Sequence, residues 1–63
     1  MKKQYLIVEV DVDEWDDYCT VQRNVLFITD ADGIKEFQGG AYDIYEILED
    51  GKLNLIQDGE RPI

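Results

Sequence analysis

The chain lacks the residues on which most enzymes depend. Its 63 residues include no histidine and no serine, and the two threonines, Thr20 and Thr29, lie in no catalytic motif. Histidine is the usual general base near neutral pH, and a hydroxyl nucleophile needs such a base beside it. Paired carboxylates can hydrolyse glycosides, but a chain of this length can hardly enclose a sugar cleft. We therefore predict that the protein is not an enzyme.

Cysteine is nearly absent too. Cys19 is the one cysteine, so no disulfide can form within the chain, which favours the reducing cytoplasm. One thiol without histidine leaves too few ligands for a zinc site. Asp30-Ala31-Asp32-Gly33 resembles the middle of a calcium loop, but with Gly33 at its sixth position the twelfth is Gly39, where a bidentate glutamate belongs. We expect a cytoplasmic protein with no metal and no cofactor.

Basic residues are few: six against 15 acidic residues, a formal net charge of -9. Such a charge repels nucleic acid and anionic lipid and attracts basic protein surfaces. The apolar run from Tyr5 to Val8 stops at Glu9 and is far shorter than a membrane span. We expect no membrane and no direct nucleic-acid contact.

The acidic residues are concentrated in one place. Six of the nine residues from Glu9 to Asp17 are carboxylates, and two aromatic residues of the types enriched at interface hot spots accompany them. The candidate partner-binding residues are Glu9, Asp11, Asp13, Glu14, Trp15, Asp16, Asp17 and Tyr18, with Asp30 and Asp32 in second rank because a turn already explains them.

The first strand is the clearest element. Leu6, Val8, Val10 and Val12 alternate with Ile7, Glu9, Asp11 and Asp13. Period two with three valines predicts a half-buried antiparallel strand, whose outer face carries three carboxylates about 6.6–6.8 Å apart. The valine face is expected to be the buried one.

Residues 14–24 allow two interpretations. Asp13 is a suitable N-cap for a short helix around 14–23, with acids in its first turn and Asn24 as a stop. The β-preferring residues Trp15, Tyr18, Thr20 and Val21 instead favour a turn leading into a longer second strand through Val25–Thr29. Residues 34–37 are expected to form a short strand or one helical turn.

A hairpin is predicted around Glu49-Asp50-Gly51. A three-residue loop with Gly51 in the left-handed conformation pairs Ile47 with Leu53 and Tyr45 with Leu55, which collects four apolar side chains on one face. A two-residue loop mixes acidic and apolar groups on that face, so we prefer the longer loop. The sum is one small domain over residues 1–63, with 58–63 a polar tail. Its predicted fold is mainly β, a small curved antiparallel sheet or half-barrel of four or five short strands with at most one short helix.

Two functions remain as hypotheses. A row of carboxylates on a rigid strand can imitate the phosphates of a nucleic acid, which predicts an inhibitor or modulator of a nucleic-acid-binding protein. In size and charge, and only in these, the chain resembles the small acidic inhibitors that bacteriophages and mobile elements encode. The alternative is an accessory or structural subunit, a homodimer or a sheet-edge partner, whose acidity is only solubilising.

Overall fold

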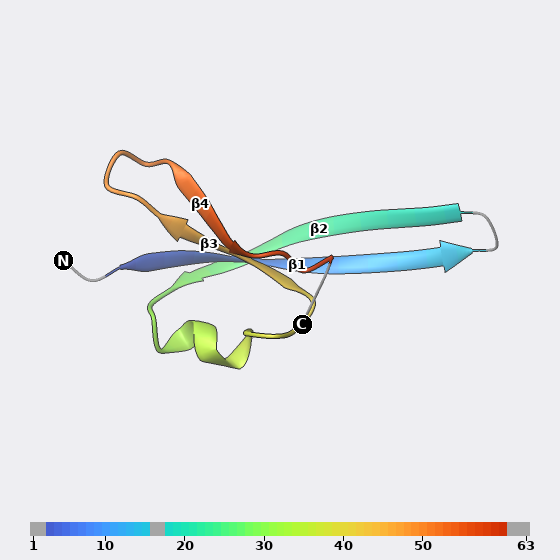
Figure 1. Ribbon diagram of the computed structural model, residues 1–63, viewed down its shortest axis with the longest axis horizontal. Coiled ribbons are helices and arrows are strands. Elements are labelled where there is room, and N and C mark those ends of the chain that lie inside the picture. The colour runs from blue at the N-terminus through green and yellow to red at the C-terminus, as the bar shows by residue number, and fades with distance from the viewer. Residues whose placement is uncertain (1–2, 16–17, 61–63) are drawn as a thin grey trace.

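The computed structural model describes residues 3–15 and 18–60, which form one four-stranded antiparallel sheet (Figure 1). The strands are β1 (Gln4–Trp15), β2 (Tyr18–Thr29), β3 (Tyr42–Ile47) and β4 (Leu53–Gln57), in the order β2-β1-β3-β4. A single turn of 3-10 helix, η1 (Gly33–Glu36), follows β2. The predicted mainly β fold of four or five antiparallel strands is confirmed. The sheet stays open and does not curl into a half-barrel.

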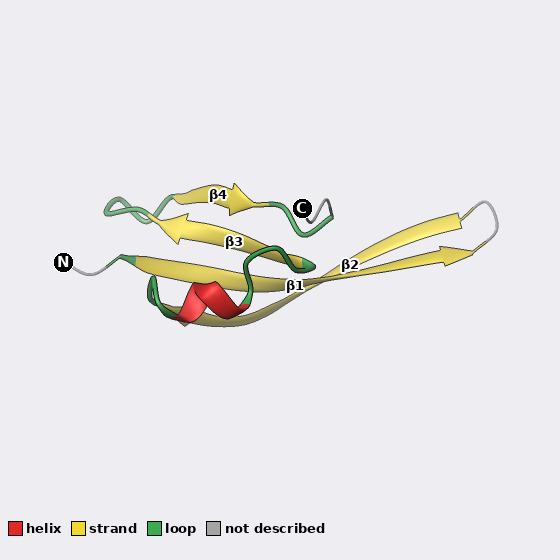
Figure 2. Cartoon of the chain, turned by 60° about the horizontal axis from the view of Figure 1, so that its bottom comes forward, coloured by secondary structure: helices red, strands yellow, loops and turns green. Residues whose placement is uncertain are grey.

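The two longest strands extend well past the others. β3 pairs with β1 only from Gln4 to Glu9, whereas β2 pairs with β1 as far as Trp15. Residues Val10–Trp15 of β1 and Tyr18–Arg23 of β2 therefore form a two-stranded arm that projects from the body of the sheet (Figures 1 and 2). The arm makes the molecule elongated, with principal extents of 47 × 23 × 17 Å.

The helix considered around 14–23 is not formed by the described residues. Glu14 and Trp15 end β1, and Tyr18–Arg23 begin β2. The rival interpretation, a turn into a longer second strand, is the one the structure shows. The β-branched and aromatic residues gain a complete set of cross-strand partners here, which outweighs the capping signal of Asp13. Asp16 and Asp17 lie outside the described residues.

The core lies on the face of the sheet that η1 covers. It consists of Tyr5, Ile7, Ile34 and Ile44, with Phe37 and Tyr42 packed against it. Phe37 contacts Phe27 and Tyr42 edge to face, at centroid distances of 5.5 and 4.9 Å. These contacts hold the segment between β2 and β3 on the sheet.

The sequence predicts that the valine face of β1 is buried and that the opposite face, which includes Ile7, is exposed. This prediction was wrong at two residues, Ile7 and Val12. Ile7 is completely buried beneath η1, whereas Val12 is 43% exposed in the arm. Val8 and Val10 are buried on the opposite face, where Gly59 packs against Val10. Alternation separates the two faces of a strand, but it does not say which face another segment covers.

Asp43 is the one buried charged residue in the described part of the chain, with 2% of its surface exposed. Its Oδ2 accepts a hydrogen bond from Arg23 Nε at 2.7 Å, and its Oδ1 accepts one from the Gly59 backbone N–H at 2.6 Å. Arg23 Nη2 also pairs with Glu60 Oε2 at 3.0 Å. The hydrogen bond to Asp43, followed by that to Glu60, raises the pKa of Arg23 above its ordinary value, so the guanidinium stays charged.

These contacts fasten the chain after β4 to the sheet. Gly59 is buried, and a Cβ there would lie 2.6 Å from Val10 Cγ2 and 2.8 Å from the Tyr42 backbone, so only glycine fits without a shift. Asp58–Glu60, the start of the predicted polar tail, is thus packed on the body. Residues 61–63 lie outside the described part.

The predicted β3–β4 hairpin is confirmed. Ile47 pairs with Leu53 and Tyr45 with Leu55, and Gly51 has φ +85°. Leu48 and Lys52 close the loop through a 2.8 Å backbone hydrogen bond, which leaves three loop residues as expected.

Gln57, at the end of β4, clamps the loop that follows η1. Its Nε2 donates to the carbonyls of Phe37 and Tyr42, both at 2.9 Å, and to that of Gly40 at 3.4 Å. Its Oε1 accepts from Gly39 N–H at 2.9 Å. One side-chain amide therefore binds three carbonyls and one N–H of the segment from Phe37 to Tyr42.

We expect Gln57→Glu to destabilise the fold by about 2–3 kcal/mol, because a carboxylate cannot donate to carbonyls and instead repels them. Thermal unfolding followed by circular dichroism measures the change. Gln38→Glu, which adds the same charge at an exposed neighbour, is the control and is expected to stay within about 0.5 kcal/mol of the parent. Equal losses in both variants would mean that added charge, not the clamp, sets the stability.

Candidate functional site: the acidic row of the arm

Three of the predicted site residues lie side by side on one face of β1. Glu9, Asp11 and Asp13 alternate along the strand, and all three are exposed. We call them the acidic row. Successive members lie about 6.6–6.8 Å apart because the strand rises 3.3–3.4 Å per residue. The row begins where β3 ends its pairing and continues along the arm.

The residues opposite the row carry no charge. Glu9 pairs with Asn24, Asp11 with Gln22 and Asp13 with Thr20. The row is therefore flanked on β2 by neutral polar side chains, and its charges face solvent without compensation from the neighbouring strand.

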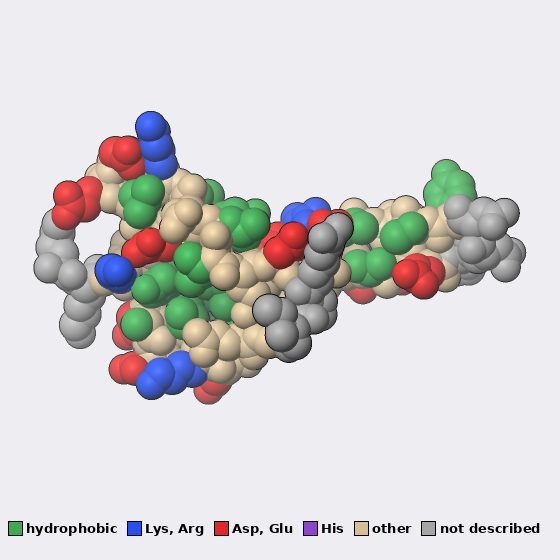
Figure 3. Space-filling model, in the orientation of Figure 1, with side chains coloured by type: hydrophobic (Ala, Val, Ile, Leu, Met, Phe, Trp, Pro, Cys, Tyr) green, Lys and Arg blue, Asp and Glu red, His purple; other side chains and the backbone are tan. Residues whose placement is uncertain are grey.

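The basic residues that the structure describes make their ion pairs elsewhere. Lys3 pairs with Glu46, Arg23 with Asp43 and Glu60, Lys35 with Asp32, and Lys52 with Asp50. Within residues 3–15 and 18–60, no ion pair reaches the acidic row. In Figure 3 the visible face of the arm beyond its base shows acidic and hydrophobic side chains and no blue atoms.

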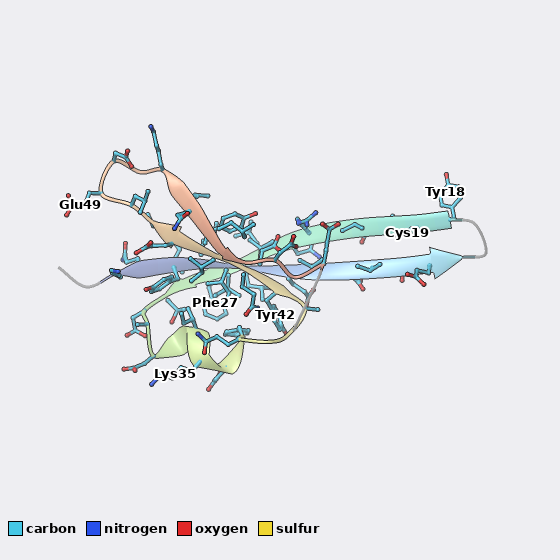
Figure 4. All side chains as sticks on the ribbon, in the orientation of Figure 1. Tyr18, Cys19, Phe27, Lys35, Tyr42 and Glu49 are labelled. Carbon is cyan, nitrogen blue, oxygen red and sulfur yellow. The ribbon has the colours of Figure 1, made fainter. Side chains whose placement is uncertain are left out.

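The other predicted site residues do not all lie on the face of the acidic row. Glu14 is paired with Cys19 and falls on the opposite face by alternation. Tyr18, 71% exposed, projects from the start of β2 at the end of the arm (Figure 4). The backbone of Trp15 pairs with Tyr18, while the Trp15 side chain, Asp16 and Asp17 are outside the described part of the structure.

The second-rank residues, Asp30 and Asp32, lie in the turn before η1 on the body. Asp30 Oδ1 accepts a hydrogen bond from Gly33 N–H at 2.9 Å, and Asp32 pairs with Lys35 at 3.5 Å. Both carboxylates therefore already have a partner within the turn and η1. Among the residues described, no three histidine, cysteine or acidic side chains group so as to hold a metal ion, and no helix is long and apolar enough to cross a membrane.

One feature of the site is invisible in the sequence. A shallow depression of about 350 Å³ lies at the base of the arm, lined by Glu9, Val10, Asp11, Ala41 and Tyr42. Tyr42 lies 33 residues from Glu9 in the chain and reaches it because the two are paired in the β1–β3 register. Only knowledge of that long-range register would have added Tyr42 to the predicted site. Two carboxylates and an aromatic ring are the groups that a lysine or arginine side chain prefers.

We expect repulsion within the acidic row to lower the thermal stability of the fold. Converting it to Glu9→Gln, Asp11→Asn and Asp13→Asn removes like-charge neighbours and breaks no ion pair of the described residues. We expect the triple variant to melt a few degrees higher than the parent at low salt, with the difference shrinking at high salt as screening takes over. Melting curves at two salt concentrations measure this, and a variant that melts lower would show that the row stabilises the fold.

No protein-family model, curated protein or solved structure matches the chain.

Proposed function

We propose that the protein is a non-enzymatic binding module whose acidic row occupies the nucleic-acid groove of a basic partner protein. The observation that carries the proposal is the row itself. Three exposed carboxylates stand at regular spacing on one face of β1, with Glu9 at the base of the projecting arm and Asp11 and Asp13 on it. They lie opposite neutral residues and clear of every ion pair among the described residues.

The spacing is suited to mimicry of a nucleic-acid backbone. Each DNA strand presents one phosphate per ~3.4 Å of axis, and successive phosphates lie farther apart along the winding backbone. Carboxylates at ~6.6–6.8 Å along a strand are comparable. Lysine and arginine side chains arranged to meet phosphates would therefore meet the row at similar intervals.

The shape of the arm suits insertion into a groove. It is two strands wide and extends beyond the body (Figure 2). A partner can therefore reach Asp11 and Asp13 on the arm, and it meets β3 at Tyr42, the residue paired with Glu9. The depression beside Tyr42 would receive one basic side chain, and exposed Tyr18 supplies an aromatic contact at the far end.

The mechanism is competition without chemistry. The net charge of -9 attracts a basic surface from a distance and speeds encounter. Once bound, the row occupies the positions that phosphates would take, so nucleic acid and this protein exclude one another. The partner is inhibited or modulated for as long as the complex lasts.

Affinity capture from lysate tests the proposal. Tagged parent is compared with the triple variant, Glu9→Gln, Asp11→Asn and Asp13→Asn. A matched control, Asp32→Asn, Glu36→Gln and Glu49→Gln, removes the same charge from exposed sites on the body. Parent and control are expected to retain a basic nucleic-acid-binding protein that duplex DNA or high salt releases, and the triple variant is expected to lose it. If parent, triple variant and control captured the partner equally, the row would serve only to keep the protein soluble.

A further inference from the structure

β2 is an edge strand with unusually little protection. Its one neighbour is β1, and ten of its twelve residues are exposed. It contains no proline, lysine or glycine, and its one charged side chain, Arg23, is held by Asp43 and Glu60. Edge strands of soluble proteins usually carry charges, proline or a cover that prevents pairing with another chain. A bulge at Leu26 interrupts the edge, which leaves Tyr18–Val25 as its regular stretch.

The arm is also incomplete as a sheet. From Val10 to Trp15, β1 has β2 as its one strand partner, and Val12 and Val21 form an exposed cross-strand pair on the face opposite the acidic row. A two-stranded ribbon in water is marginally stable, and three or more strands with an apolar face are needed for independent stability. A further strand would stabilise the arm, and the outer backbone N–H and C=O groups of β2 are available to pair with one.

The regular stretch of β2 also exposes large apolar side chains beside its free backbone groups. Tyr18 is 71% exposed, Val21 36% and Val25 69%. An edge strand with exposed apolar side chains favours pairing with another chain. A single strand pair buries less than the ~800 Å² that each partner contributes to a standard interface, so we expect a weak dimer.

We propose that β2 pairs antiparallel with β2 of a second copy of this chain, so that the two arms form one four-stranded sheet in the order β1-β2-β2-β1. The twofold axis passes through the regular stretch at Val21 or Gln22. Antiparallel pairing about an axis perpendicular to the sheet keeps like faces on one side, so Val12 and Val21 of both copies form a continuous apolar strip.

Electrostatics permits this dimer at physiological salt. The two acidic rows are separated by three strand spacings, ~14 Å, which exceeds the Debye length of ~8 Å at 0.15 M. At about 0.01 M the Debye length is ~30 Å and the two copies repel. Added salt therefore strengthens the dimer, whereas it weakens binding of a basic partner.

The dimer also bears on the proposed function. It places two acidic rows on one face, ~14 Å apart, comparable with the ~12 Å width of the DNA major groove between its phosphate strands. That consequence rests on the proposed function, but the dimer itself does not, and its test uses the purified chain alone.

Sedimentation equilibrium of the full chain, up to about 1 mM, tests the pairing. We expect a monomer–dimer equilibrium that strengthens between about 0.02 and 0.3 M NaCl. Val21→Lys sets two lysines against each other if the axis passes at Val21, and sets each lysine against Arg23 of the other copy if it passes at Gln22. Either way we expect the dimer to weaken at least tenfold. Leu53→Lys, the same kind of change at an exposed apolar residue of β4 on the body, is the control and is expected to leave it within about threefold. A monomer at every concentration, growth beyond two copies, or a dimer indifferent to Val21→Lys would overturn the proposal.

A cross-linking experiment gives an independent readout. Paired residues of antiparallel strands have Cα atoms ~4.5–5.5 Å apart, within the ~4.4–6.8 Å range of a disulfide. In a Cys19→Ala background, Val21→Cys or Gln22→Cys is expected to form a covalent dimer on oxidation, and Val12→Cys is not. Cross-linking no faster at either position than at residue 12 would contradict the β2 pairing.

Discussion

Asp43→Ala is expected to unfold much of the protein at room temperature. The substitution removes the acceptor of the buried Gly59 N–H and the main partner of Arg23. Leaving buried polar groups without partners costs about 2–4 kcal/mol. A chain of this size has only about 3–5 kcal/mol of stability to lose. Asp43→Asn keeps an acceptor for Gly59 but loses the charge, so it is expected to fall between parent and Asp43→Ala.

Chemical denaturation measures the order of these variants. Asp32→Asn, which neutralises an exposed carboxylate on the body, is the matched control and is expected to change stability by less than about 0.5 kcal/mol. Hydrogen exchange at Gly59 offers a local readout, because its amide loses protection once the Asp43 acceptor is gone. If both Asp43 variants matched the Asp32 control, the buried carboxylate would not anchor the end of the chain.

The largest expected effect on binding follows removal of the acidic row. The triple variant, Glu9→Gln, Asp11→Asn and Asp13→Asn, loses three charges that would each meet a basic side chain of the partner. We expect its dissociation constant to rise about 100-fold or more, through a faster off-rate and a slower on-rate. The body control, Asp32→Asn, Glu36→Gln and Glu49→Gln, has the same net charge and is expected to stay within about tenfold, because long-range attraction alone is reduced.

The salt dependence separates contacts from bulk charge. Fewer charge contacts give a shallower decline of affinity with salt, so the triple variant is expected to show a smaller slope than parent or control. Titration calorimetry at three salt concentrations measures both quantities. Equal slopes for the triple variant and the control would mean that net charge, not the row, drives binding.

Most of β1, the second half of β2 and the β3–β4 hairpin were predictable because local signals specify them. The Asp50-Gly51 turn and the apolar alternation around it fix the register of Ile47 with Leu53 without help from the rest of the chain. The acidic row was predictable for the same reason, since strict alternation from Leu6 to Asp13 leaves one choice of neighbours.

Other features depend on contacts between distant segments. The helix considered around 14–23 competed with a strand of equal local merit, and only pairing with β1 decided between them. Ile7 is buried because η1 packs over it, and the local sequence of β1 does not specify that contact. Asp43 and Gln57 bind backbone groups of segments that are 15 or more residues away in the sequence. In the sequence, nothing distinguishes Asp43 from the other acidic residues, of which the chain has 15 in all.

The most direct test of the central claim is displacement of DNA. The captured partner is purified, loaded with fluorescently labelled duplex, and titrated with parent, triple variant and body control while the anisotropy of the duplex is followed. We expect parent and control to release the duplex and the triple variant to leave it bound. Release by the triple variant at the same concentration as parent, or a ternary complex in which the partner holds both the duplex and this protein, would contradict the claim.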